Sequence, residues 1–221
     1  MSEVKALFEE MRREMAGVEG RIRDHPFPKR VEEGRVARER FSPFVAEQYH
    51  IITSDLRSVA HLLVRFGAGE SRQFFLNTLQ GEAAALAALR KLAAALGVEW
   101  GTLEDYQPDP AAHAYTAYMA WLSLYGSDAE VAAAFGVNFP AWGHNCGRLR
   151  DALRARWGMR EEDVEFLSLF ATVPPGFEEG VLAVMESGLK RGVPAGHIKR
   201  AARLIQAYEL MFWDAMDRLV A

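Results

Sequence analysis

Residues 42–66 read SPFVAEQYHIITSDLRSVAHLLVRF, and this segment determines the fold class that we expect. Ser42-Pro43 matches an N-cap followed by a proline in the first helical turn, where the missing N–H costs nothing. Apolar residues then recur at helical spacing as far as Phe66, and Gly67-Ala68-Gly69 follows as an end signal. The segment therefore predicts one long helix with an apolar face.

The same helical spacing continues on both sides, and no run alternates with the period of a β-strand. Upstream, a charged helix is expected over about 2–15, ending before His25-Pro26-Phe27-Pro28, because two nearby prolines break a helix. Downstream, Ser127 and Glu130 have capping-box spacing for a short helix, and Asn138-Phe139-Pro140 should interrupt the pattern. Further helices are expected over about 71–96, 161–171, 176–190 and 194–219. One more begins at Asp109-Pro110, and another continues after Pro140 to about Trp157. We predict a single all-α domain over residues 1–221, a bundle of about eight to nine helices.

Composition and charge limit the classes of partner that we expect for this protein. The chain is 50% hydrophobic, 25% charged and carries a formal net charge of −4, whereas nucleic-acid-binding surfaces are normally basic. Residues 1–24 contain no apolar run typical of a secretory signal, and no stretch is long and apolar enough for a membrane span. Cys146 is the only cysteine, which suits a reducing compartment. We expect a cytoplasmic protein whose partner is a small molecule, not nucleic acid or membrane.

Three carboxylates stand among apolar residues in the predicted helices: Glu47, Glu82 and Glu209. A carboxylate buried in such surroundings is costly unless it is hydrogen-bonded or protonated. One interpretation is a pocket acid or base with a raised pKa. The other is a carboxylate on the polar face of its helix, or one that a neighbouring tyrosine satisfies. The sequence leaves both interpretations open.

Four stretches, in this order, resemble the signatures of the TenA family: His25-Pro26-Phe27, Phe41 to Tyr49, Ala114 to Met119 with Gly126-Ser127 and Glu130, and Tyr208 to Asp214. The similarity covers most of the chain from about residue 22. It implies the heme-oxygenase-like all-helical fold of that family, which includes the type II thiaminases. It also implies a homodimer or homotetramer and no bound cofactor.

The resemblance carries over to the thiaminase site only in part. Glu209 matches the family's glutamate and Tyr115 its pocket tyrosine. The nucleophilic cysteine falls on Asn138, and the aspartate that would anchor a pyrimidine amino group falls on Gln48. Trp142 and Phe170 replace tyrosines. Asparagine cannot perform the covalent chemistry of a thiolate, so that mechanism is not expected here.

Cys146 does not replace the missing nucleophile in a simple way. It follows Asn138 by eight residues, so the two share a helix face only if the helix runs through Pro140. A lone cysteine is more often a small buried hydrophobe. Some members of the family lack the cysteine and use carboxylates, a part that Glu47 and Glu209 could play.

The same fold suggests two alternative sites. Glu47 and His50 have the Glu-x-x-His spacing of diiron proteins, and with Glu82 they form an incomplete metal site. A heme- or metal-dependent oxidase, including one resembling the PqqC enzymes, is therefore an alternative. His25 precedes the long helix loosely as a heme ligand would, but a helix-capping or packing role suits it better. A non-enzymatic binding or regulatory protein is the third possibility.

The favoured prediction is a central pocket that binds or hydrolyses an amine-bearing, pyrimidine-like metabolite without a cysteine nucleophile. Glu209 would be the general acid and base. The remaining pocket residues would bind and orient the ligand: Gln48, Glu47, Glu82, Tyr115, Asn138, Trp142 and Phe170.

Overall fold

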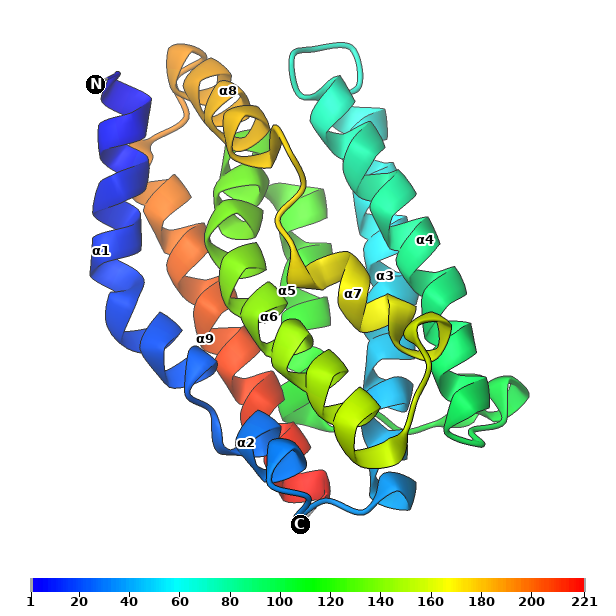
Figure 1. The fold of residues 1–221 in the computed structure, drawn as a ribbon. Coiled ribbons are helices and arrows are strands. Elements are labelled where there is room, and N and C mark those ends of the chain that lie inside the picture. Colours follow the sequence, from blue (N-terminus) through cyan, green and yellow to red (C-terminus); the bar gives the residue numbers. More distant parts are fainter. Residues whose placement is uncertain (1, 221) are drawn as a thin grey trace.

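The computed structural model describes residues 2–220 and contains only helices and connecting segments in that range. Figure 1 shows the long helices running roughly side by side as a bundle, with the C-terminal helix beside the first one. The nine α-helices within the described residues are α1 (Glu3–Arg23), α2 (Pro26–Glu32), α3 (Ser42–Phe66), α4 (Arg72–Ala95), α5 (Pro110–Tyr125), α6 (Asp128–Trp157), α7 (Glu165–Ala171), α8 (Phe177–Lys190) and α9 (Ala195–Leu219). Three short 3₁₀ helices connect them: η1 (Arg38–Phe41), η2 (Trp100–Asp105) and η3 (Glu161–Val164). The all-α prediction is confirmed.

Local sequence signals explain most helix ends. The predicted span of α3 is confirmed, with Pro43 in the first turn and Gly67 as the C-cap. The predicted N-cap is wrong: Phe41 occupies that position, Ser42 is the first helical residue, and no side chain caps this end. The Asp109 side chain accepts from the N–H of Ala111 and caps α5, whose N1 residue is proline. Ser127 and Glu130 form the predicted capping box. The first helix is longer than predicted and continues past Met15 to Arg23, where buried Ile22 anchors its last turn.

Residues 127–157 correct the sequence prediction. We expected Asn138-Phe139-Pro140 to separate two helices, but α6 runs unbroken through Pro140. A proline inside a helix removes one hydrogen bond and costs about 3 kcal/mol. Burying one large apolar side chain yields about 1.5–3 kcal/mol, and α6 has such residues on both sides of Pro140, Phe135 and Leu149 among them. Packing of the whole helix therefore outweighs the local preference of the proline.

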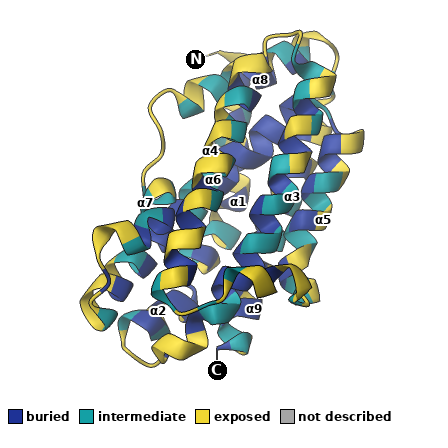
Figure 2. Ribbon diagram, turned by 90° about the vertical axis from the view of Figure 1, so that its right-hand side faces the viewer, coloured by how far each residue is buried: buried dark blue, intermediate teal, exposed yellow. Residues whose placement is uncertain are grey.

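Helix α6 lies at the centre of the bundle and packs against α1, α2, α7, α8 and α9. On the other side, α3 packs against α4 and α5, and α5 packs against α9. Figure 2 shows the buried residues concentrated on the inward faces of these helices and the exposed ones on their outward faces and on the connecting segments. None of the described helices is both long and apolar enough to cross a membrane.

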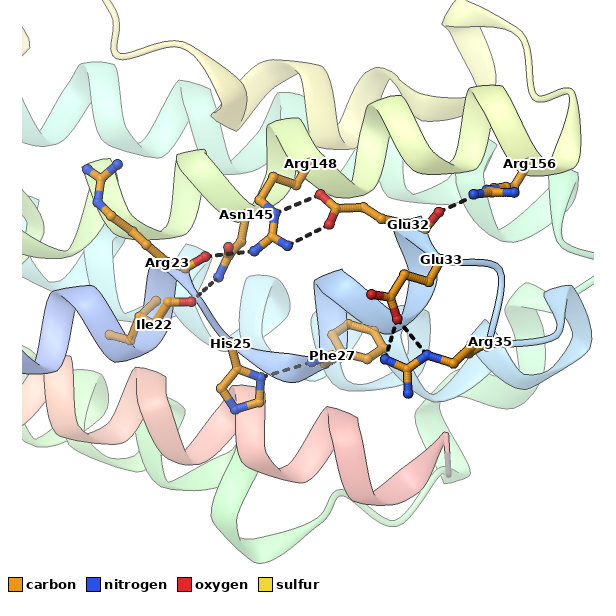
Figure 3. A network of polar contacts seen from close by, with 10 residues as sticks. All are labelled: Ile22, Arg23, His25, Phe27, Glu32, Glu33, Arg35, Asn145, Arg148 and Arg156. Carbon is orange, nitrogen blue, oxygen red and sulfur yellow. Dashed lines mark hydrogen bonds and ion pairs between the residues drawn. The ribbon is translucent and has the colours of Figure 1, made fainter.

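Polar contacts hold the junction of α1 and α2 against α6 (Figure 3). The Arg148 guanidinium donates to both carboxylate oxygens of Glu32, over 2.7 and 2.6 Å, and to the carbonyl oxygen of Arg23 over 2.7 Å. The Asn145 amide donates to the carbonyl of Ile22 over 2.8 Å. His25 Nδ1 accepts from the N–H of Phe27, which confirms the helix-capping role. These contacts fix the α6 turns that follow Asn138 and Trp142.

Candidate active site

A cavity of about 710 Å³ lies between helices α3 to α9. That volume is within the range of small-molecule pockets, about 300–1,000 Å³. Exposed residues from the start of α4 and from the α7–α8 segment, such as Gln73 and Pro174, form its outer part. Six of the predicted binding residues line it together with Glu209: Gln48, Glu82, Tyr115, Asn138, Trp142 and Phe170.

Glu209 lies in the wall of this cavity and is only 2% exposed. Trp213 Nε1 donates to Glu209 Oε1 over 3.0 Å from one turn further along α9. Asn138 Nδ2 donates to the other oxygen, Oε2. Burial raises the pKa of Glu209 to about 8, and the two hydrogen bonds act in the opposite direction. At neutral pH this carboxyl group can therefore both give and take a proton.

Asn138 owes its position to the continuous helix through Pro140. Its amide also lies 3.4 Å from Gln206 Oε1, and the Gln206 amide donates to the Val137 carbonyl over 3.1 Å. Gln206 and Asn138 are both buried. This hydrogen-bonded set fixes the amide of Asn138 beside Glu209.

Two more carboxyl groups, Asp55 on α3 and Glu82 on α4, line the same cavity. Burial, and then the charge of Glu82, raises the pKa of Asp55 well above its usual range. Burial raises the pKa of Glu82 to about 7. The side chain of Glu82 keeps some exposure because it borders the cavity. The Tyr115 phenol has a strongly raised pKa from burial and from the charges of Asp55, Glu82 and Glu209, so it stays neutral.

Aromatic rings form the apolar part of the wall. Trp142 packs edge-on against Phe170 and Phe212, with ring centroids 5.9 and 5.7 Å apart. All three rings line the cavity. A flat ring fits such a wall, since aromatic pairs favour offset-stacked and edge-to-face arrangements.

Every charged residue that lines the cavity is acidic: Asp55, Glu70, Glu82 and Glu209. No lysine, arginine or histidine is among the described lining residues. The cavity therefore suits cations and neutral hydrogen-bond donors, and it disfavours phosphorylated or carboxylated ligands.

Glu47 is not among the lining residues, in contrast to our prediction. Its Oε1 accepts from the Tyr106 hydroxyl over 3.1 Å and from the N–H of Asp109 over 2.7 Å. The carboxylate thus holds the segment between η2 and α5. This matches the second interpretation of the sequence, a buried carboxylate that a tyrosine satisfies. Successive residues of a helix point about 100° apart, so Glu47 and its neighbour Gln48 face different surroundings.

The incomplete metal site is not assembled either. His50 packs against the rings of Tyr49 and Tyr106 and is not among the residues that line the cavity with Glu82. Within residues 2–220, no three His, Cys, Asp or Glu side chains converge in an arrangement that could hold a metal ion. Cys146 is fully buried and is not a lining residue; burial, and then the charge of Glu209, raises its pKa.

Asp55 is the site residue that the sequence analysis missed. Its neighbours Ser54 and Arg57 are polar, so the segment resembles a solvated helix face. The helical spacing nevertheless indicates which way Asp55 faces. Asp55 follows Gln48 by seven residues and Ile51 and Ile52 by four and three, which places it on the face that lines the cavity.

Comparison with known proteins identifies the family and supports the fold. The model of the TENA/THI-4/PQQC family matches residues 12–218. A TenA homologue from Pyrococcus furiosus is 20% identical with a TM-score of 0.74, over 95% of this chain and 99% of that one. A TenA homologue from Pseudomonas syringae pv. tomato is 12% identical with a TM-score of 0.81, over 95% and 92%.

A third structure extends the comparison of the fold. A domain of unknown function with a heme oxygenase-like fold, from Shewanella denitrificans, is 13% identical with a TM-score of 0.76, over 99% of this chain and 93% of that one. No curated protein matches the sequence significantly. The fold is heme-oxygenase-like, and the chain belongs to the TENA/THI-4/PQQC family.

Proposed function

We propose that this protein binds an amine-bearing heteroaromatic metabolite in the central cavity and hydrolyses a carbon–nitrogen bond of it, with Glu209 as general acid and base. The observation that carries the proposal is the position of Glu209, a buried carboxyl group in the cavity wall that Asn138 and Trp213 orient. Membership of the TENA/THI-4/PQQC family supports a small-molecule site in this place.

The ligand class follows from the lining. Among the described residues that line the cavity, every charged side chain is acidic, which favours an amine or a protonated ring nitrogen. Trp142, Phe170 and Phe212 offer aromatic faces and edges to a flat ring. The Gln48 amide and the Tyr115 hydroxyl supply neutral groups that can donate and accept hydrogen bonds.

The chemistry needs only water as co-reactant. Glu209 takes a proton from a water molecule, whose oxygen then bonds to the carbon that bears the amine. The carbon–nitrogen bond breaks, and Glu209 returns the proton to the leaving nitrogen, which departs as ammonia. A carboxyl group with a pKa of about 8 suits both proton transfers near neutral pH. Asn138 holds the carboxyl group in position and forms no covalent intermediate.

The test is ammonia release from a panel of amino- and aminomethyl-pyrimidines, with wild-type protein and Glu209→Gln. Wild type should release ammonia from at least one member, and the variant should be at least about 100-fold slower, the usual contribution of a general acid or base. Ligand-dependent melting measures binding separately from turnover.

Three outcomes decide the matter. Turnover that Glu209→Gln abolishes while melting shifts persist supports the proposed role. Turnover that survives in the variant contradicts it. Melting shifts without ammonia release from any compound identify a binding protein and contradict the hydrolytic step.

A further inference from the structure

We propose that Asp55 and Glu82 form a second cation-binding subsite in the cavity, so that the natural ligand carries two basic nitrogens, one at this pair and one near Glu209. The inference rests on the proposed function only in placing an amine-bearing ligand in the cavity. It names a feature of that ligand which the position of Glu209 alone does not indicate.

The first observation is the isolation of Asp55. Its side chain is only 3% exposed, and its Oδ1 is buried without any hydrogen-bond partner. A buried acceptor without a partner costs about 1–3 kcal/mol, and more when it is charged. Such a group is rare in folded proteins unless a ligand or a proton compensates for it.

The second observation is that Asp55 and Glu82 are placed where a ligand can reach them. Both line the cavity, from α3 and α4, and the charge of Glu82 acts on Asp55. None of the described lining residues carries a positive charge that could pair with them. A cation that neutralises this pair must therefore come from the contents of the cavity.

The third observation is the contrast with Glu209, whose two carboxylate oxygens accept hydrogen bonds from Trp213 and Asn138. The protein thus satisfies one carboxyl group of the cavity internally and leaves another bare. The charges of Asp55, Glu82 and Glu209 all raise the pKa of the Tyr115 phenol. Its neutral phenol can bridge a ligand that contacts both positions.

The proton balance is definite. In the empty cavity, burial and the neighbouring carboxyl group favour a protonated Asp55. When a ligand ammonium group binds, the carboxyl group ionises, its proton passes to the buffer, and an ion pair with hydrogen bonds replaces the O–H bond. Binding a second ammonium group should therefore release a proton.

The experiment is calorimetric titration with two diamines, putrescine and cadaverine, against butylamine and pentylamine. Wild type should bind at least one diamine about tenfold or more tightly than the monoamine of equal chain length, the effect of about 1.4 kcal/mol. Titration in buffers of different ionisation enthalpy counts the protons released. Asp55→Asn should lower diamine affinity to the monoamine level and abolish the proton release.

Glu70→Gln is the matched control, because it removes a negative charge from the same cavity at an exposed position. It should leave the preference for diamines in place. Asp55→Asn replaces a protonated carboxyl group by an amide of the same shape, and a melting curve checks that the variant folds.

The outcomes separate this proposal from the proposed function. Unchanged diamine affinity and proton release in Asp55→Asn would overturn the second subsite, even if Glu209→Gln still abolishes turnover. A diamine preference that Asp55→Asn removes supports the subsite, even if no pyrimidine is hydrolysed. Equal losses in Asp55→Asn and Glu70→Gln would mean a general charge effect and would also overturn it.

Discussion

The indole Nε1 of Trp213 donates a hydrogen bond of 3.0 Å to Oε1 of Glu209, one turn away on the same helix. Trp213 is fully buried and packs against Trp142, with ring centroids 5.1 Å apart. The tryptophan thus connects the general acid and base of the proposed mechanism to the aromatic wall. Its N–H favours the charged form of the carboxyl group against the effect of burial.

Replacing Trp213 by phenylalanine keeps an aromatic ring and removes this donor. A hydrogen bond to a charged group contributes about 1.5–3 kcal/mol, so we expect the pKa of Glu209 to rise by about one unit or more from about 8. The measurement is the carbon chemical shift of the Glu209 carboxyl group followed against pH. Trp142→Phe is the control, because it trims a neighbouring indole that is not bonded to Glu209. Equal shifts in both variants would attribute the effect to lost volume and not to the donor.

Stability should fall as pH rises from about 4.5 to 8. The pKa of Glu209 is about 8 in the folded chain, against an ordinary value of 4.5. Between these values the folded state holds a proton that the unfolded state has lost, so raising the pH favours unfolding. Asp55 and Glu82 shift in the same direction. The contribution of Glu209 alone is on the order of a few kcal/mol.

Urea denaturation at several pH values measures this loss, and Glu209→Gln isolates one contribution. The variant cannot ionise at this position, so its free energy of unfolding should depend less on pH than that of wild type. Parallel pH profiles for the two proteins would show that Glu209 does not titrate with a raised pKa.

Patterns of three to seven residues predicted most of the fold. The proline and glycine at the ends of α3 and the capping box of α6 both act within one or two helical turns. The continuity of α6 through Pro140 could not be predicted in this way. It depends on packing against α9, α8 and α1, which no local pattern contains.

The site was predictable to a similar degree. Gln48, Glu82, Tyr115, Asn138 and Glu209 line one cavity, and their roles in binding or catalysis stay predictions. Glu47 is not a lining residue, because its carboxylate faces the segment between η2 and α5, a contact that no pattern within one helix indicates. The bare carboxyl group of Asp55 emerges only when α4 and α5 are placed beside α3.

Cys146 should be unreactive in the native protein. It is fully buried, and its raised pKa leaves little thiolate, the form that attacks thiol reagents. A disulfide reagent such as Ellman's should therefore find almost no reactive thiol in the folded chain and one in denaturant, since this is the only cysteine.

A thiol placed in the cavity provides the contrast. Asn138→Cys puts a cysteine at the cavity wall beside Glu209, where small reagents can enter. This variant should expose one reactive thiol in the native state. Rapid labelling of wild type, or equal rates for the two proteins, would contradict the buried position of Cys146.

The close approach of α6 and α7 at Gly143 should be essential for the aromatic wall. A Cβ on Gly143 would come within 2.3 Å of the Phe170 carbonyl oxygen, so Gly143→Ala must push α7 away from α6. We expect a loss of about 1–3 kcal/mol in the free energy of unfolding, the usual cost of overpacking. The displaced Phe170 should also weaken ligand binding, because that ring lines the cavity.

Gly147, one turn later on α6, is the matched control for this change. A Cβ there meets only Ala171 Cβ at 3.7 Å, an ordinary contact. Gly147→Ala should therefore stabilise the protein by up to about 1 kcal/mol, because alanine favours a helix over glycine. Denaturation curves of the two variants should move in opposite directions. If Gly143→Ala also stabilises the protein, the helices must leave room for a Cβ beside the Phe170 carbonyl oxygen. The aromatic wall then does not depend on glycine at this position.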